Sequence, residues 1–192
     1  VSNRPHPKAI GGVDIYVSHR NEKGEWSKAV PLPAPINTKG DEKTPFIHTD
    51  SQTLYFSSKD VTDYETGDII AYGHMGLGGY DIFYTRMKDG VWLEPKNIGY
   101  PINTEEDEIG FTVSTDGKLG YFASNKYSSD NTYNIVAFSL YQEARPQKVL
   151  FLKGTLKDEE TQEVAKEAKI EIKNLETKKV TEIEVDQQTG EY

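Results

Sequence analysis

Histidines and paired carboxylates are the residues in this chain that could carry hydrolytic or metal chemistry. The four histidines follow neither a His-x-x-x-His nor a His-Glu-x-x-His spacing, so we expect no zinc site; they are His6, His19, His48 and His74. The chain contains no cysteine, which excludes disulfides, thiolate-bound zinc and thiol catalysis.

Two acidic pairs, Asp41-Glu42 and Asp107-Glu108, are the candidates for acid–base catalysis. Glycosidases need two carboxylates that face each other about 5–10 Å apart. Both pairs occupy the same place in a repeated motif, so we expect a structural or surface role. The Ser114-x-Asp116-Gly117 motif differs from the Asp box of sialidases because Gly directly follows Asp and no Trp follows. No serine lies in a Gly-x-Ser-x-Gly elbow.

Four acids in one loop are the alternative for a metal site, with calcium as the ion. They are Asp60, Asp63, Glu65 and Asp68. Their spacing is irregular and lacks the EF-hand form. The glycine-rich stretch at 73–79 is not G-x-G-x-x-G, and no helix is expected after it, so it does not predict phosphate binding. The sequence predicts no cofactor and no metal.

Charge and hydropathy limit the partners of the chain. The formal net charge is −9 and the pI is about 5.0, which argues against binding to nucleic acid or to an anionic membrane surface. No apolar run approaches the length of a membrane span, so no direct membrane insertion is expected. No signal peptide or initiator methionine is visible, and we expect the chain to be a piece of a longer protein.

An internal repeat with an offset of 66 residues (Trp26 to Trp92) organises positions 11–140. GGVDIY at 11–16 returns as GGYDIF at 78–83, and PINT at 35–38 returns at 101–104. A fixed period across separate motifs indicates a repeat architecture. The repeated positions that we interpret as structural are Trp26, Trp92, Asn37, Asn103, Asp50, Asp116, Gly117, Gly78, Gly79 and Asp81.

Alternation of apolar and polar residues predicts the strands of each copy. They are expected at 13–19, 25–30, 44–48 and 53–58, at 81–87, 91–93, 109–114 and 119–124, and at 133–138. Asp116-Gly117 predicts a hairpin turn because Gly tolerates positive φ. The first copy has Ser51 in place of Gly117, which favours a different turn type there.

Four-stranded antiparallel units that repeat in this way predict an all-β chain with β-propeller blades. A single blade cannot bury both of its apolar faces, but stacked blades can. Trp26 and Trp92 are therefore expected to be buried as wedges between adjacent sheets.

The motifs GGYDIF, W-x-x-P, PINT, DE and S-x-DG-x-x-x-YF resemble the WD40-like Pro-Asp propeller repeats of TolB-like and OmpA-family proteins. The resemblance covers about residues 11–140, and the propeller domain is expected at 1–146. Two positions depart from the pattern. Phe111 stands where the first copy has Pro45, and Trp26 lacks the proline that follows Trp92 at Pro95.

A second domain is expected at 147–192, after a linker at 142–148. Predicted strands lie at 149–155, 168–173 and 180–185. The stretch resembles the start of a carboxypeptidase regulatory-like domain, a small β-sandwich that is incomplete here. The resemblance implies no peptidase activity, and its motif positions are Gly154, Asp158, Ala168, Ile170, Thr189, Gly190 and Tyr192.

The order of the two domains is similar to that in OmpA-family lipoproteins, including the PorE-type component of type IX secretion. This resemblance implies a non-enzymatic interaction scaffold in the periplasm of a Gram-negative bacterium, associated with the outer membrane. The implied partners are other envelope or secretion-system proteins, with peptidoglycan bound only through a domain outside these residues. The alternatives are an accessory propeller of a hydrolase and a solute-binding propeller.

The loop at 59–79 is the candidate partner-binding segment because it is much longer than its equivalent at 125–132. Insertions on one face of a repeat protein often form its binding face. The alternative is a loop that packs on itself and covers its own sheet. The candidate residues are Val61, Tyr64, Ile69, Ile70, Tyr72, His74 and Met75.

Overall fold

The computed structural model describes residues 1–130, 132–149, 152–165, 168–175, 178 and 180–192. The chain forms two compact units, Val1–Val149 and Leu150–Tyr192, and each is described by itself. The described chain is all-β as predicted, with one short 3-10 helix and no α-helix among these residues. No helix in the described part is long and apolar enough to span a membrane.

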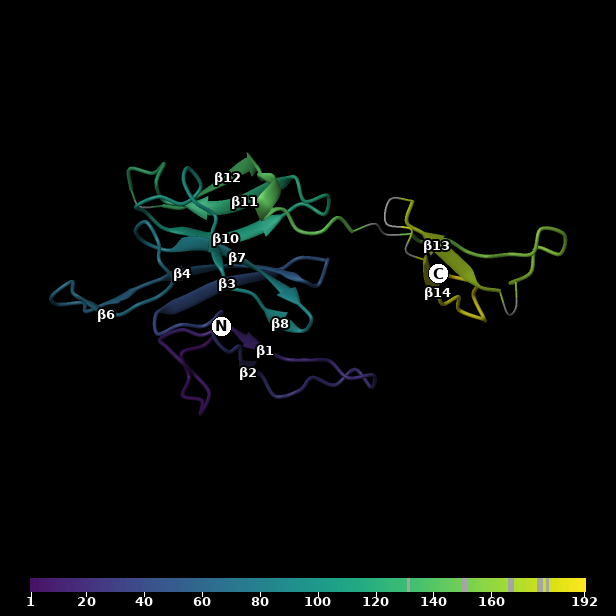
Figure 1. The fold of residues 1–192 in the computed structure, drawn as a ribbon, viewed down its shortest axis with the longest axis horizontal. Helices are drawn as coiled ribbons and strands as arrows, with labels where there is room; N and C mark the ends of the chain where they lie inside the picture. The colour runs from purple at the N-terminus through teal and green to yellow at the C-terminus, as the bar shows by residue number, and fades with distance from the viewer. Residues whose placement is uncertain (131, 150–151, 166–167, 176–177, 179) are drawn as a thin grey trace. The chain divides into compact units, whose positions relative to one another are not determined.

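The first unit is built on a central antiparallel sheet (Figure 1). Its order is β3 (Asp41–Ile47), β4 (Thr53–Lys59) and β7 (Asp81–Lys88), and β7 is then paired by β8 (Val91–Trp92) and β9 (Lys96–Asn97). Short connections join consecutive strands except between β4 and β7, where the long loop leaves the sheet.

Two smaller sheets lie on either side of the central sheet (Figure 1). One contains β10 (Glu108–Val113), β11 (Leu119–Ser124) and β12 (Asn134–Ser139), and the other contains β1 (Tyr16–Val17) and β2 (Val30–Pro31). Strand β10 contacts β3, β4 and β7 of the central sheet. The strand positions predicted in the repeats are confirmed except at 25–30, where β2 covers only Val30–Pro31. The strand predicted at 13–19 is reduced to Tyr16–Val17, and β9 was not predicted.

The two β-hairpin turns within the repeats have the same conformation. Ser51 has φ +57° and Gly117 has φ +73°, so both residues are left-handed. The prediction of a different turn type at Ser51 is therefore wrong. The reason is the preceding acid: Asp50 and Asp116 each accept a hydrogen bond from the backbone N–H two residues further on, which stabilises such a turn without glycine.

Apolar side chains fill both spaces between the sheets. The cluster on the β10–β12 side contains Tyr55, Ile82, Tyr84, Ile98, Ile102, Phe111, Val113, Phe122, Leu140 and Ala144. The cluster on the β1–β2 side contains Ile15, Ile36, Leu54, Phe56 and Phe83. Mutual burial of these faces is the main stabilising contribution to the unit.

Only one of the two repeated tryptophans packs in the core. Trp92 is partly buried and packs against the cluster on the β1–β2 side. Trp26 is 68% exposed, so the prediction that it is a buried wedge is wrong. Trp26 forms only an isolated bridge with Arg20 in the connection between β1 and β2, and neither apolar cluster includes it.

The second unit contains one hairpin, β13 (Ile170–Lys173) paired with β14 (Val180–Ile183). Gly154 and Tyr192 exchange two backbone hydrogen bonds. A Cβ atom at position 154 would lie 2.4 Å from the Tyr192 hydroxyl oxygen, so a larger residue there would displace the Tyr192 ring. The predicted strand at 149–155 is wrong for its described part, which has only an isolated bridge at Thr155; residues 150–151 lie outside the described residues.

The two tryptophans provide a matched pair for a stability measurement. We expect Trp92→Ala to lower the free energy of unfolding by about 1–3 kcal/mol, because it opens a cavity beside a partly buried ring. Trp26→Ala should change it by less than about 0.5 kcal/mol. Urea unfolding checks both values, and an equal loss in the two variants would contradict the packing described above.

Candidate interaction surface

Two buried asparagines act as backbone partners in the repeats. The Asn103 Oδ1 atom accepts the Ile82 N–H at 2.8 Å, and its Nδ2 donates to the Ile82 carbonyl oxygen at 2.8 Å. Asn37 makes the same two bonds with Ile15, at 2.9 and 3.0 Å. Each side-chain amide therefore makes the two hydrogen bonds that a neighbouring strand would make with that residue, and its role is structural.

Both glutamates of the candidate acidic pairs are buried. Glu108 accepts hydrogen bonds from the Thr104 N–H and hydroxyl, both at 2.8 Å, and from the Ser124 hydroxyl at 2.9 Å. Glu42 makes the equivalent contacts one copy earlier. Burial raises the pKa of both carboxyls, although these hydrogen bonds oppose it. Neither glutamate is presented to a substrate.

The aspartates of the same pairs bind backbone N–H groups in the residues just before β1 and β7. Asp41 Oδ1 accepts the Val13 N–H at 2.9 Å, and Asp107 Oδ1 accepts the Tyr80 N–H at 2.8 Å. Their second oxygens accept hydroxyl groups, from Tyr80 to Asp41 at 3.1 Å and from Tyr133 to Asp107 at 2.9 Å. The contacts recur in both copies and supply no catalytic arrangement.

The Gly-Gly-x-Asp motif makes close approaches that a side chain would prevent. A Cβ atom at Gly78 would lie 2.2 Å from the Glu105 carbonyl oxygen, and one at Gly79 would lie 2.3 Å from Asp107 Oδ1. Asp81 is buried and accepts two backbone N–H groups of the same loop. The glycines are therefore needed for packing.

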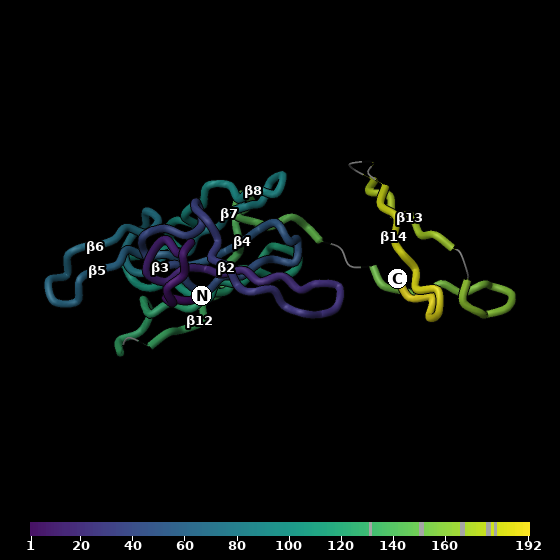
Figure 2. The backbone as a smooth tube through the Cα atoms, turned by 90° about the horizontal axis from the view of Figure 1, so that it is seen from below, coloured from purple at the N-terminus to yellow at the C-terminus, as the bar shows by residue number. Residues whose placement is uncertain are grey.

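The long loop forms a hairpin that projects away from the sheets (Figures 1 and 2). It contains β5 (Val61–Thr62) paired with β6 (Ile69–Ala71). At the tip, Asp63 accepts two backbone N–H groups, which lower the pKa of its carboxyl. At the base, Asp60 accepts the Gly73 N–H at 2.7 Å. Asp60 and Asp63 thus bind the backbone of their own loop.

The hairpin carries an exposed apolar surface on an otherwise acidic chain. Tyr64 is fully exposed and Met75 is 92% exposed. Ile69, Ile70 and Tyr72 are also exposed. Tyr64, Ile69, Ile70 and Tyr72 are defined here as the hairpin surface, whereas Met75 follows the base of the hairpin at Gly73. All five are among the predicted partner-binding residues. Val61 is only half exposed.

His74 lies in the anchor of the hairpin. Its ring centroid is 5.4 Å from that of Phe56 and 5.1 Å from that of Phe83. Its Nε2 atom is 2.9 Å from the Ile36 carbonyl oxygen. The prediction that His74 contributes to the binding surface is therefore wrong, because its ring fills the space beside the core.

The four acids of this loop do not form a metal site. Within the described residues, no three His, Asp or Glu side chains are grouped so that they could hold a metal ion. The calcium alternative at Asp60, Asp63, Glu65 and Asp68 therefore has no support from their geometry.

The chain after β12 is docked on the first unit and does not behave as the predicted linker at 142–148. Leu140 is buried, and the 3-10 helix η1 (Gln142–Ala144) buries Ala144 in the cluster on the β10–β12 side. We call residues 140–147 the exit segment. Its composition resembles that of a linker, but its backbone is bound by side chains far away in the sequence.

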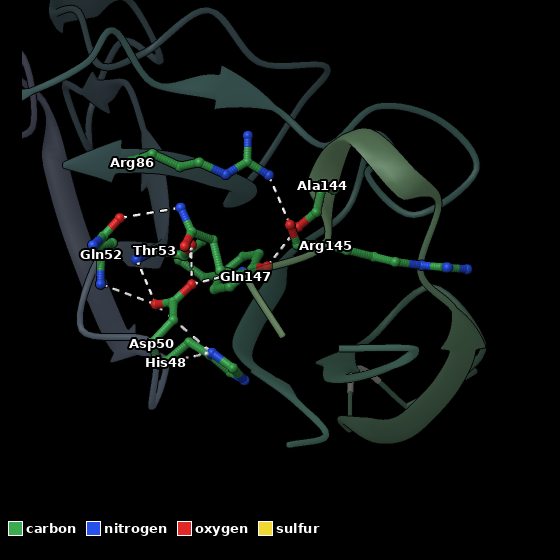
Figure 3. Close-up of polar contacts among 9 residues, drawn as sticks. His48, Asp50, Gln52, Thr53, Arg86, Ala144, Arg145 and Gln147 are labelled. Atoms are coloured by element: carbon green, nitrogen blue, oxygen red, sulfur yellow. Dashed lines mark hydrogen bonds and ion pairs between the residues drawn. The ribbon is translucent and has the colours of Figure 1, made fainter. Parts of the chain in front are cut away.

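Arg86 and Tyr55 bind the carbonyl groups of the exit segment (Figure 3). Arg86 donates to the carbonyl oxygens of Glu143 and Arg145, each at 2.7 Å. The Tyr55 hydroxyl donates to the Ala144 carbonyl oxygen at 2.5 Å. Sequence reasoning missed these residues because nothing local marks them as partners of this segment.

Asp50 binds the end of the exit segment from the opposite side (Figure 3). Its side chain is 3% exposed and accepts the Gln147 N–H at 2.8 Å, together with the Thr53 hydroxyl at 2.7 Å. Burial alone would raise the pKa of Asp50, but these bonds and the N–H groups of Gln52 and Thr53 hold it below its usual value. The buried His48 accepts the Asp50 N–H at Nδ1.

Comparisons with known proteins returned no match to a family model, a curated protein or a solved structure. The function proposed below is therefore inferred from the motifs and the geometry of this chain.

Asp50→Asn tests the docking of the exit segment and its pH dependence. We expect Asp50→Asn to lower the free energy of unfolding by about 1–3 kcal/mol at pH 7, because the Gln147 N–H would lose a buried carboxylate partner. Since the folded pKa of Asp50 lies below its ordinary value of 3.8, this stability is present above pH 3.8 and disappears as the pH falls through the folded pKa. Urea unfolding at pH 7 and in acid measures the difference.

Asp116→Asn is the matched control, because Asp116 occupies the same turn in the next copy with no hydrogen bond to the exit segment, only an electrostatic interaction with Arg145. Asp116→Asn should lower the free energy of unfolding by less than Asp50→Asn does at pH 7. Equal losses in the two variants would show that only the turn is affected.

Proposed function

We propose that the first unit is a segment of a β-propeller that serves as a non-enzymatic protein-interaction scaffold. Two observations support the propeller: antiparallel sheets are stacked face to face, and the repeat places equivalent residues in successive sheets. Stacking of such sheets around an axis is how repeated blades bury their faces.

The hairpin surface is the observation that carries the scaffold proposal. Exposed apolar groups that gather on one projecting element are typical of protein-binding sites. The element is anchored by His74 and Asp60 at its base, and Tyr64, Ile69 and Ile70 are exposed on its projecting part. In the acidic pairs, which are the main candidates for catalysis, the glutamates are buried and the aspartates are half-buried. All four carboxyls accept hydrogen bonds from other groups of the chain, and this supports a non-enzymatic role.

The proposed setting follows from the motif resemblances given above. We place the protein in the periplasm, associated with the outer membrane, as a PorE-like component with envelope or secretion-system proteins as partners. We interpret the second unit as the start of a regulatory-like β-sandwich, which agrees with its antiparallel hairpin and its Gly154–Tyr192 contact.

Site-specific photocrosslinking in whole cells tests the scaffold function. A photoreactive phenylalanine analogue at Tyr64 should give discrete crosslinks to another protein, because Tyr64 lies on the hairpin surface. The same analogue at Trp26, which is also exposed but lies in the connection between β1 and β2, should not give those products. The combined replacement of Ile70 and Tyr72 by serine should abolish the Tyr64 crosslinks. Identical crosslinks from both positions, or none from Tyr64, would contradict the proposal.

A further inference from the structure

The ring of His74 shows what the space on the β1–β2 side of the central sheet can hold. Its centroid is 5.4 Å from that of Phe56 and 5.1 Å from that of Phe83, and both phenylalanines belong to the apolar cluster on that side. Its Nε2 atom is 2.9 Å from the Ile36 carbonyl oxygen. Because a carbonyl oxygen can only accept a hydrogen bond, Nε2 carries the ring proton and donates it. Apolar walls and one backbone acceptor thus hold a flat ring that carries an N–H.

The corresponding space one copy later is a cavity. The repeat equivalents of Phe56, Phe83 and Ile36 are Phe122, Val136 and Ile102. These three equivalents line a cavity of about 340 Å³. Phe122 and Ile102 belong to the cluster on the β10–β12 side, and Val136 packs against it. The cavity therefore lies between the third sheet and the central sheet, inside the first unit.

The carbonyl group of Ile102 is the backbone acceptor of this cavity. The Ile102 N–H donates to the Gly99 carbonyl oxygen, and the Ile36 N–H donates to the equivalent Pro33 carbonyl oxygen, both at 3.1 Å. The backbone is therefore held in the same way in the two copies. The Ile36 carbonyl accepts the ring N–H of His74, whereas no described residue donates to the carbonyl of the buried Ile102. A buried acceptor without a donor is costly, and a ligand with an N–H would remove that cost.

The residue equivalent to His74 does not fill the cavity. Tyr127 precedes Tyr133 by six residues, as His74 precedes Tyr80. Tyr127 lines the cavity, but its side chain is 64% exposed. The ring that closes the space in the central sheet thus has no buried counterpart here.

We propose that this cavity binds a small molecule that carries a flat nitrogen heterocycle of the indole type. The ring packs against Phe122 and Val136, and its N–H donates to the Ile102 carbonyl oxygen. Because Val136 is smaller than the equivalent Phe83, the space is wider than that around His74 and accepts two fused rings. A mostly apolar cavity of this volume with few polar groups is typical of small-ligand sites. The site is separate from the hairpin surface.

Indole is the probe, and the full 192-residue chain is the receptor. We expect saturable chemical-shift changes in two-dimensional NMR spectra, concentrated at Ile102, Phe122 and Val136. Benzofuran is the matched control compound, because it has the same two-ring shape with an oxygen in place of the N–H. It should bind at least about tenfold more weakly, since it leaves the Ile102 carbonyl without a donor.

Val136→Trp in the receptor should abolish indole binding, because the larger ring occupies the cavity. Ile135→Trp is the matched control: Ile135 is the neighbouring residue of β12, is 84% exposed and lies on the other face of the strand, so binding should be unchanged. Circular dichroism and urea unfolding check that both variants fold.

Four results would overturn the proposal. They are the absence of saturable binding, equal affinity for benzofuran, shift changes that fall outside the cavity lining, and full binding by a folded Val136→Trp variant. The first three are measured on the unaltered chain and do not depend on the variant. Nuclear Overhauser contacts between the rings of Tyr127 and Phe122 in the free protein would also overturn it, because the chain's own side chain would then occupy the cavity.

Discussion

The pairing of a buried asparagine amide with the backbone of a preceding strand is the interaction on which the repeats depend. Asn37 and Asn103 lie where the chain passes from one sheet to the next, and each holds the N–H and C=O of one residue in the strand it has left. The buried glutamate that follows then ties a threonine and a serine to the start of the new sheet. The two contacts fix how successive sheets are joined.

These polar groups are stabilising only because nearly all of them are paired. An unpaired buried amide or carboxyl group costs several kilocalories per mole, whereas a fully satisfied network specifies one arrangement. A strand that slipped by one residue would lose the asparagine pairing and turn its apolar face to water. The conserved geometry of the two copies therefore leaves little freedom for function within the sheets, and the variation is found in the hairpin at 59–79 and in the chain after Leu140.

The repeat period predicted the strands and the equivalence of their residues well, because both depend on local pattern. Burial depends on which neighbours are present, and so the period could not predict that Trp92 is partly buried while Trp26 is exposed. The docking of the exit segment could not be predicted either, since its carbonyl groups bind Arg86, more than fifty residues away. The loop singled out for its length forms a projecting hairpin, and its role in partner binding stays a prediction. His74 belongs to the anchor of this hairpin because aromatic neighbours from two strands surround its ring.

Amide hydrogen exchange at three equivalent residues tests the central claim most directly. The N–H groups of Ile15 and Ile82 bind buried asparagines, whereas the equivalent Ile135 lies on β12, which among the described residues pairs only with β11. The account predicts that Ile15 and Ile82 exchange about a hundredfold or more slowly than Ile135, because their exchange requires opening of the packed sheets. Exchange at Ile82 as fast as that at Ile135 would contradict it.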